Sequence, residues 1–312
     1  MENSFLKLVS HDLYCRYGTD LSRIAVVFPN KRASLFFNEY LSYESDLPVW
    51  SPAYYAINDL VEEISPLEAG DPIKLVCELY KVFTEETNSE ESLDEFYFWG
   101  ELLIRDFDDL DKNLVEADKL FLNLQNLKEL SMDYSFLSLE QEEAIQQFFQ
   151  NFSVERRTTL KERFLSLWEK LGTIYQKYKE RLDKQKIAYE GMLYRAAIEG
   201  LDVSELPYET YVFVGFNVLN KVENLLFRKL KDAKMALFYW DYDNFYMDKE
   251  HHEASEFIRR NLLEFPSTLP KKAFSFLEKK KKVTYVAAPA IPFRQKTAGY
   301  KHVSTHWIQT CK

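Results

Sequence analysis

The sequence contains little glycine and little cysteine, and each shortage excludes a class of protein. Only eight of the 312 residues are glycine, and none of them lies in a loop of the form G-x-x-x-x-G-K-S/T. Because the amides of that loop bind nucleotide phosphates, ATP hydrolysis by the usual phosphate-loop mechanism is excluded. The three cysteines, Cys15, Cys77 and Cys311, are far apart and odd in number, which excludes a disulfide framework and a zinc site. We interpret Cys15 and Cys77 as small core residues rather than redox groups.

The sequence also lacks a long apolar run. No stretch of about 18 uninterrupted apolar residues occurs, so no membrane-spanning helix is expected. The N-terminus is amphipathic and has neither the continuous apolar stretch nor the small-residue cleavage site of a signal peptide. We therefore predict a cytoplasmic protein with no membrane contact. With 46% apolar and 16% aromatic side chains, the chain can bury one large core or two linked cores.

Charge is distributed unevenly along the chain. The net charge is −10, but residues 271–312 hold ten Lys and Arg against the single acid Glu278, a local charge of +9. The first 270 residues then carry 30 basic and 49 acidic groups, a net charge of −19. Such a body repels phosphate on average. A nucleic-acid contact therefore needs a local basic groove or another part of an assembly.

Strand and helix patterns alternate at the two ends of the sequence. The apolar run Arg23–Pro29 predicts a buried parallel strand, and Lys31–Leu41 predicts a helix whose apolar spacing consists of Leu35, Phe36, Tyr40 and Leu41. Further strands and helices are expected at Tyr211–Gly215, Leu219–Leu230, Met235–Trp240, Glu253–Leu263 and Val283–Ala287. Such alternation indicates an α/β protein, a parallel sheet with helices on both faces.

Between Pro48 and about Ile187 the pattern changes to successive helices. They are expected at Ile57–Ile64, Pro72–Thr87, Leu93–Phe107, Leu114–Leu130, Leu139–Phe149 and Leu160–Leu182. Asp71-Pro72 and Ser92-x-x-Glu95 are typical helix starts. We therefore predict an α/β domain made of residues 1–55 and 188–288, interrupted by a helical insertion at 56–187.

Residues 289–312 have no amphipathic period. They fit a disordered basic tail, a truncated or frame-shifted end, or an extension at the edge of a sheet.

The turn between the first strand and its helix has the sequence Phe28-Pro-Asn-Lys-Arg-Ala33. It places two cations and free backbone amides at a helix N-terminus, an arrangement suited to contact a nucleic-acid backbone. The alternative is a solvated turn whose cations merely flank a buried strand.

Four other sequence patterns are not taken to indicate a catalytic or metal-binding site. The acidic run Asp106–Asp111 is expected to be a polar helix end or an acidic face toward a partner, because it lacks the pattern of a calcium loop. Adjacent His251 and His252 have no zinc-type spacing. The E-x-K at Glu278–Lys280, with Asp241 or Asp243 upstream, lies in a charge run and is taken as coincidence. The aromatic clusters Phe96–Trp99 and Tyr239–Tyr246 are expected to pack in the core.

VVFPNKRASLFFNEYL resembles the single-strand-contacting segment of superfamily 1 helicases of the UvrD type, and Tyr211–Leu230 and Leu237–Tyr246 fall where that family has later motifs. The resemblance implies a RecA/P-loop-like sheet with a 1B-like helical insertion. It also implies DNA contact by Asn30, Lys31, Arg32 and Tyr246. Gly215 and Phe216 stand where that family has its metal-binding acids, so no metal, no cofactor and no catalytic residue is expected in this chain.

With VFPNKRA followed by FVGFN, and with residues 96–121, 188–195 and 236–246, the chain resembles the N-terminal region of AddB/RecC-like PD-(D/E)XK nuclease family proteins of bacteria, particularly the Bacteroidetes type. The likeness covers roughly residues 1–288. It implies a non-catalytic helicase-like domain of a nuclease that processes double-strand breaks. That domain would guide single-stranded DNA or dock a helicase/nuclease partner subunit or further C-terminal domains. A protein interaction scaffold without DNA contact is the second hypothesis, and an ATPase with a nonstandard loop is the third.

Overall fold

The computed structural model describes residues 4–117, 119–121, 170–247 and 253–270. Several sequence predictions lie outside these residues. They are the helix Leu139–Phe149, the strand Val283–Ala287, the residues His251, His252 and Glu278–Lys280, and the segment 289–312. The predicted helices Leu114–Leu130 and Leu160–Leu182 are described only in part.

Four parallel strands form the central sheet, in the order β2-β1-β5-β6. They are β1 (Ile24–Phe28), β2 (Ala53–Ala56), β5 (Thr210–Val214) and β6 (Ala236–Tyr239). Strands β1 and β5 are the β-branched and aromatic runs IAVVF and TYVFV, and nearly all of their residues are buried. Such runs are typical of strands covered on both faces. The predicted α/β class with a parallel sheet is confirmed, whereas the short strand β2 was not predicted.

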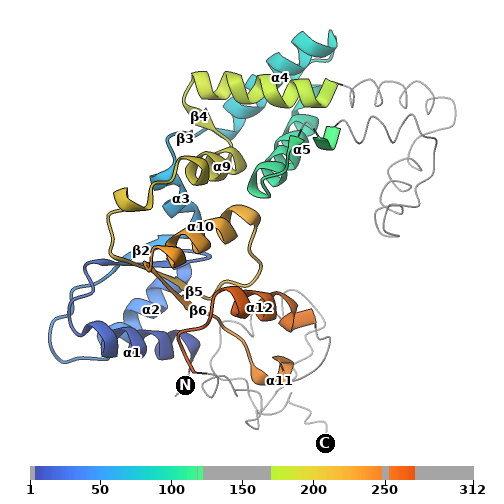
Figure 1. The fold of residues 1–312 in the computed structure, drawn as a ribbon. Coiled ribbons are helices and arrows are strands. Elements are labelled where there is room, and N and C mark those ends of the chain that lie inside the picture. Colours follow the sequence, from blue (N-terminus) through green and yellow to red (C-terminus); the bar gives the residue numbers. More distant parts are fainter. Residues whose placement is uncertain (1–3, 118, 122–169, 248–252, 271–312) are drawn as a thin grey trace, which may run out of the picture.

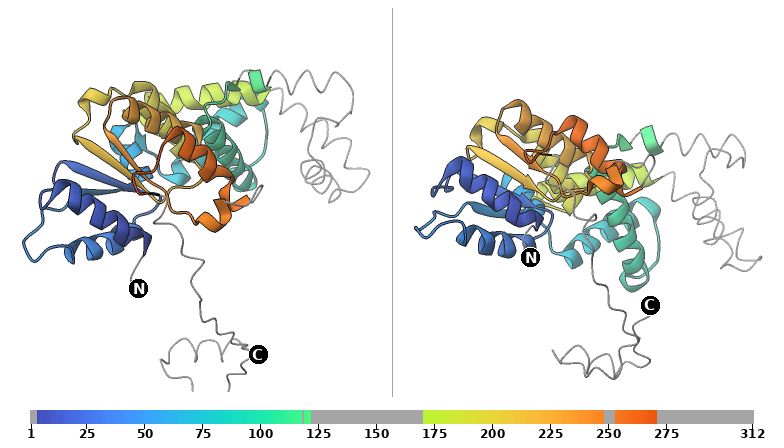
Figure 2. Two further views of the ribbon diagram at one scale, coloured as in Figure 1. Left: turned by 60° about the horizontal axis from the view of Figure 1, so that its bottom comes forward. Right: turned by 90° about the horizontal axis from the view of Figure 1, so that it is seen from below.

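Helices cover both faces of the sheet (Figures 1 and 2). On one face, α1 (Phe5–Tyr17) and α2 (Arg32–Ser42) pack against side chains that include Val26, Val212 and Val214. On the other face, α3 (Ile57–Ile64), α10 (Lys221–Asp232) and α12 (Glu253–Glu264) pack against the alternate residues, which include Val27 and Phe213. Successive strand residues point to opposite faces, so each strand contributes to both cores.

Beyond α3 the chain forms a group of helices (Figure 1). They are α4 (Pro72–Thr87), α5 (Leu93–Lys112), α9 (Glu190–Gly200) and the helix at residues 170–184. The two-residue strands β3 (Glu68–Ala69) and β4 (Ile187–Ala188) pair in parallel beside them. The 3-10 turn η1 (Val203–Glu205) leads toward β5, and the short helix α11 (Asn244–Met247) follows β6.

The predicted boundaries are correct for α3 and α4, and the predicted end is too early for α5. Helices α3 and α4 begin and end where the sequence predicts, and Asp71 Oδ1 accepts from Lys74 N at 3.0 Å at the start of α4. At the start of α5, Glu95 Oε2 accepts from Ser92 N at 2.9 Å, which confirms the capping pair. Helix α5 continues to Lys112, beyond the predicted end at Phe107.

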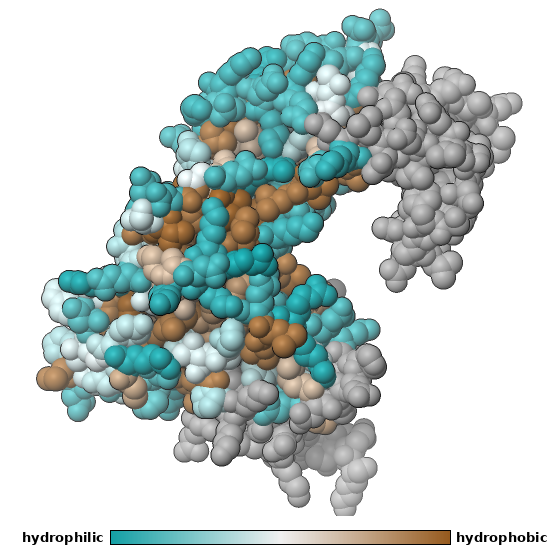
Figure 3. Space-filling model, in the orientation of Figure 1, coloured by the Kyte–Doolittle hydropathy of each residue, from teal (hydrophilic) through white to brown (hydrophobic). Residues whose placement is uncertain are grey.

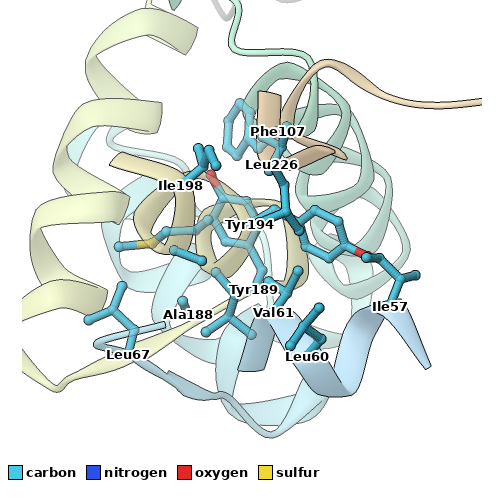
Figure 4. Packing of buried hydrophobic residues seen from close by; sticks show 14 of the residues in the cluster. Ile57, Leu60, Val61, Leu67, Phe107, Ala188, Tyr189, Tyr194, Ile198 and Leu226 are labelled. Atoms are coloured by element: carbon cyan, nitrogen blue, oxygen red, sulfur yellow. The ribbon is translucent and has the colours of Figure 1, made fainter. Parts of the chain in front are cut away.

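One continuous apolar core joins the sheet to these helices. Ile57, Leu60 and Val61 of α3 and Tyr194 and Ile198 of α9 belong to one cluster, which extends from sheet residues to α5 and α10 (Figure 4). Helices α3 and α9 therefore lie between the sheet and the remaining helices. Burial of this surface is the main favourable term for folding.

The interpretation of Cys15 as a core residue is wrong, because its side chain is exposed, and Cys77 is only partly buried. Helix α1, which was not predicted, buries the stripe Phe5, Val9 and Leu13, whose members are four residues apart. Cys15 lies two positions beyond this stripe and therefore points to another side of the helix. Within the described residues, no helix is long and apolar enough to cross a membrane.

Gly191 allows α9 to pack directly on α5. A Cβ at this position would press on the Asp108 carbonyl oxygen and lie 2.7 Å from the Asp108 Cα. We expect Gly191→Ala to lower the free energy of unfolding by about 1–3 kcal/mol, the cost of overpacking against backbone. Gly200→Ala in the same helix has no atom within 4 Å and serves as the control. Urea denaturation measures both, and equal stabilities of the two variants would contradict the prediction.

Candidate functional site

The carboxyl ends of the four strands form one edge of the sheet, and the direction of winding reverses between β1 and β5. From β1 the chain crosses to β2 on one side, and from β5 it crosses to β6 on the other. In open α/β sheets, ligands bind outside the carboxyl ends of strands at such a switch point. The turn at residues 29–31 and the loop at 215–220 follow β1 and β5 at this point. These two segments frame the candidate site.

The structure brings the predicted residues Asn30, Lys31 and Arg32 together at this edge. Asn30 Oδ1 accepts a hydrogen bond from Arg32 N at 3.1 Å, so its side chain closes the turn. Ser34 Oγ donates to the Lys31 carbonyl oxygen at 2.6 Å. The side chains of Lys31 and Arg32 remain exposed. The turn therefore has a defined shape and presents two cations outward.

Lys31 has an acidic partner that the sequence did not reveal. Its Nζ lies 2.8 Å from Asp59 Oδ1 of α3, although the lysine side chain is 77% exposed. The hydrogen bond that Lys31 donates to Asp59 raises the pKa of Lys31, which therefore stays charged. Asp59 Oδ2 also accepts from Ala56 N at 3.2 Å, so this carboxylate joins the turn after β1 to the start of α3. A phosphate at the turn would compete with Asp59 for the ammonium group.

The outer face of α2 is apolar next to these cations. Leu35 is 71% exposed and Phe36 is 44% exposed, and each lies four residues after one of the two cations. Both belong to the apolar spacing from which the helix was predicted, but Phe37 and Leu41 are the residues that α2 buries. Side chains four residues apart share a helix face. Arg32 and Phe36 therefore lie on the same face of α2.

Tyr246 lies at the same edge but apart from the cationic turn. It belongs to α11, which follows β6, and its amide donates to the Asp243 carbonyl oxygen at 3.0 Å. Strand β5 separates β6 from β1, so the two strands are roughly 10 Å apart at ordinary sheet spacing. Tyr246 is half-buried, with its ring 5.4 Å from that of Phe245. It is therefore not part of the group formed by Asn30, Lys31 and Arg32.

The loop after β5 carries no acid next to the strand. Gly215 has a positive φ of 75°, and its amide donates to the Tyr239 carbonyl oxygen at 2.9 Å. Phe216 turns inward, with its ring 5.3 Å from that of Phe227. This end of the loop is therefore a packed apolar corner. Val218, farther along the loop, is 59% exposed beside the switch point.

The aromatic clusters are only partly buried, in contrast to the prediction. Phe96, Tyr239 and Trp240 lie in the core, as expected. Phe98, however, is 70% exposed and Trp99 is 41% exposed on α5. These two side chains lie off the buried face of α5. A run of four consecutive aromatic residues does not indicate which of them face the core. Apolar side chains also reach the surface between the sheet and the upper helices (Figure 3).

A groove of about 360 Å³ lies between α3, α4, α5 and α9. Its charged lining consists of Glu62, Glu101, Arg105, Asp108 and Glu190. Four acids against one arginine make this groove unsuitable for phosphate. The carboxyl edge of the sheet is therefore the better position for an anionic ligand.

Asp111 is a buried acid at the centre of a polar network in the helical part. It is fully buried and accepts from Tyr175 at 2.6 Å, from Lys179 at 2.9 Å, from Arg195 at 2.8 Å and from Tyr189. Burial acts to raise the pKa of Asp111, but the charge of Lys179 and the hydrogen bonds from Arg195 and the tyrosines lower it overall. The network joins α5, α9 and the helix at 170–184.

For Asp111, the prediction of a polar helix end or a partner-facing acid is wrong. The residue shares the buried stripe of α5 with Phe96, Gly100 and Phe107, and this spacing was the signal in the sequence. Asp108 is also engaged, by Lys112 at 2.7 Å and by the amide of Gly191. These partners explain why α5 continues through the acidic run.

Among the residues that the structure describes, no three His, Cys, Asp or Glu side chains are grouped as metal ligands. No family model matches the chain, and no curated protein matches its sequence.

Removing the Asp111 charge should destabilise the fold. We expect Asp111→Asn to lower the free energy of unfolding by about 3–5 kcal/mol, because Lys179 and Arg195 lose their buried anion. Asp109→Asn, at an exposed position of the same helix, should change it by less than about 0.5 kcal/mol. Urea denaturation at neutral pH measures both.

The Asp111→Asn variant should also make the free energy of unfolding depend less on pH under acidic conditions. The pKa of Asp111 is lowered in the folded state, so its contribution is complete above the unfolded pKa of about 4 and is lost as the pH falls further. Below about pH 4, the wild-type chain should therefore lose stability more steeply than Asp111→Asn. Parallel pH profiles would show that the aspartate is not the charged centre of the network.

Proposed function

We propose that this chain is a RecA/P-loop-like domain that retains the sheet but not the groups that bind a triphosphate and its metal. In this proposal it is the non-catalytic helicase-like domain of an AddB/RecC-like nuclease that processes DNA breaks. The helices between α3 and α9 would correspond to the 1B-like insertion. Its role would be to guide single-stranded DNA across the carboxyl edge of the sheet. Nuclease activity would belong to further domains or to a partner subunit.

The observation that supports this role most directly is the position of the cationic turn. Lys31 and Arg32 lie exposed beside the switch point between β1 and β5, where α/β sheets bind their ligands. Within the part of the chain that the structure describes, no ion pair involves Arg32, so its guanidinium is available for a phosphate.

The aromatic neighbour of these cations suits a single strand. Phe36 lies one helical turn from Arg32 and is 44% exposed. Single-strand binding combines cations on the backbone with aromatic rings on unpaired bases. Arg32 and Phe36 would therefore contact one nucleotide from the same helix face.

Two features make the proposed contact weak. Asp59 already binds Lys31, and the first 270 residues carry a net charge of −19. The chain would then hold DNA that other parts of an assembly deliver, rather than capture it from solution.

An interaction scaffold without DNA contact is the second candidate function. The exposed pair Phe98 and Trp99 on α5 favours it, because contiguous exposed aromatics mark association surfaces. This surface lies in the helical part and not at the carboxyl edge.

Reversing the two cations should remove single-strand binding. We expect Lys31→Glu with Arg32→Glu to abolish binding of a dye-labelled oligothymidine, measured by fluorescence anisotropy at low salt. The matched control is Arg23→Glu with Lys234→Glu, which changes the net charge equally at the opposite edge of the sheet. Equal binding by both double variants would exclude the carboxyl edge and favour the scaffold.

Releasing Lys31 from its partner should have the opposite effect. Asp59→Asn keeps an acceptor for the Ala56 amide but removes the charge that holds Lys31. We expect tighter oligothymidine binding, with a slope of log K against log salt that is steeper by about 0.7, the value for one added phosphate contact. An unchanged slope would mean that Lys31 does not reach the backbone.

A further inference from the structure

Three side chains at the other edge of the sheet combine a nucleophile, a base and a carboxylate. Cys15 Sγ lies 3.6 Å from His11 Nε2, and His11 Nδ1 lies 2.8 Å from Glu44 Oε2. A nucleophile within reach of a base, which a third group orients, is the arrangement that activates a thiol. This group is separate from the cationic turn and does not depend on the proposed DNA contact.

The chain positions the three residues from two different elements. His11 and Cys15 are one turn apart on α1, close to the end of this helix. Glu44 follows α2, and its amide donates to the Leu41 carbonyl oxygen at 3.2 Å. Both helices end on the side where the strands begin, because β1 follows α1 and β2 follows α2. The group therefore lies at the amino edge of the sheet.

The carboxylate determines where the protons lie. An ionised carboxylate only accepts hydrogen bonds, so Nδ1 of His11 carries a proton and donates to Glu44. In the neutral imidazole, Nε2 is then the acceptor that faces the Cys15 thiol. Transfer of the thiol proton to Nε2 leaves a thiolate beside an imidazolium whose other N–H is bound by Glu44.

Exposure differs among the three groups in a way that suits this chemistry. Cys15 is exposed and the His11 side chain is 64% exposed, so reagents in solution reach the sulfur. The Glu44 side chain is only 12% exposed, so the orienting carboxylate is sheltered.

The other acidic side chains near His11 have hydrogen-bond partners of their own. Asp12 of α1 binds Arg16 at 2.7 Å and accepts from Tyr239 Oη at 2.6 Å. Glu39 of α2 accepts from Tyr43 Oη at 3.4 Å. Among these acids, Glu44 is the one that binds His11.

We propose that Cys15 is a modification site that undergoes exchange with low-molecular-weight disulfides, with His11 as its base and Glu44 as a positioning residue. The Cys15 thiol loses its proton to His11 Nε2, and the thiolate attacks one sulfur of the disulfide. A new sulfur–sulfur bond forms as the original one breaks, and the departing thiolate takes up the proton. Cys15 is oxidised to a mixed disulfide while the departing half is reduced to a thiol.

The first test measures how fast iodoacetamide alkylates each cysteine of the full, reduced chain, followed by mass spectrometry of the peptides. At pH 7, Cys15 of the native chain should react about tenfold faster than Cys15 in urea, because His11 Nε2 lies 3.6 Å from the sulfur and accepts the thiol proton. Cys77, which has no such neighbour in the described structure, should react more slowly when native than in urea. This comparison needs no variant and is independent of any folding defect.

Variants then assign the roles. His11→Gln should reduce the native Cys15 rate to the value in urea, and Glu44→Gln should reduce it partly. Both should shift the rate profile to higher pH, a change that a merely structural role of Glu44 would not produce. Glu39→Gln removes an equal charge from a neighbouring position and should leave the rate unchanged.

The second test uses glutathione disulfide as the probe. Cys15 should form the mixed disulfide before Cys77, and reduction should reverse it. A native Cys15 rate no faster than the rate in urea, a rate unaffected by His11→Gln, or alkylation without any mixed disulfide would overturn the proposal.

Discussion

A parallel sheet is stable only when both of its faces are covered, and this constraint organises the whole molecule. Strands β1 and β5 are buried on both faces, so the chain must supply helices to each side. Helices α1 and α2 form one cover, and α3, α10 and α12 form the other. Because α3 also packs on α9, the second cover continues into the remaining helices without a separate boundary in the core. The position of the loops at both edges of the sheet follows from this arrangement.

Charge is used differently in the two parts of the structure. In the helical part, Asp111 is buried with two cations and two phenols, which leaves no unpaired charge in the network. Such a group determines how the helices pack rather than what they bind, since a buried charge without its partners is costly. At the carboxyl edge of the sheet, Lys31 and Arg32 remain accessible to solvent. Of these two groups of charges, only Lys31 and Arg32 can therefore bind an anion from solution.

The two edges of the sheet have different chemistry. The carboxyl edge presents cations, an exposed phenylalanine and the reversal of winding that creates a binding position in α/β folds. The amino edge presents a thiol whose histidine is oriented by a sheltered carboxylate. Both groups lie on or next to α1 and α2, the helices of one face. The proposed functions are nevertheless independent, because they use different residues at opposite ends of the strands.

The sequence by itself determined the parallel α/β class, the strands β1, β5 and β6, and the limits of α3 and α4. Local signals suffice there, because apolar periodicity and capping residues act within a few positions. It also placed the cationic turn correctly at a helix start. Only the tertiary structure decided that Asp59 pairs with Lys31, that Phe36 faces outward and that His11, Cys15 and Glu44 meet. These relations join segments that are distant in the sequence or depend on which side of a helix faces the sheet, and neither property is encoded in a local pattern.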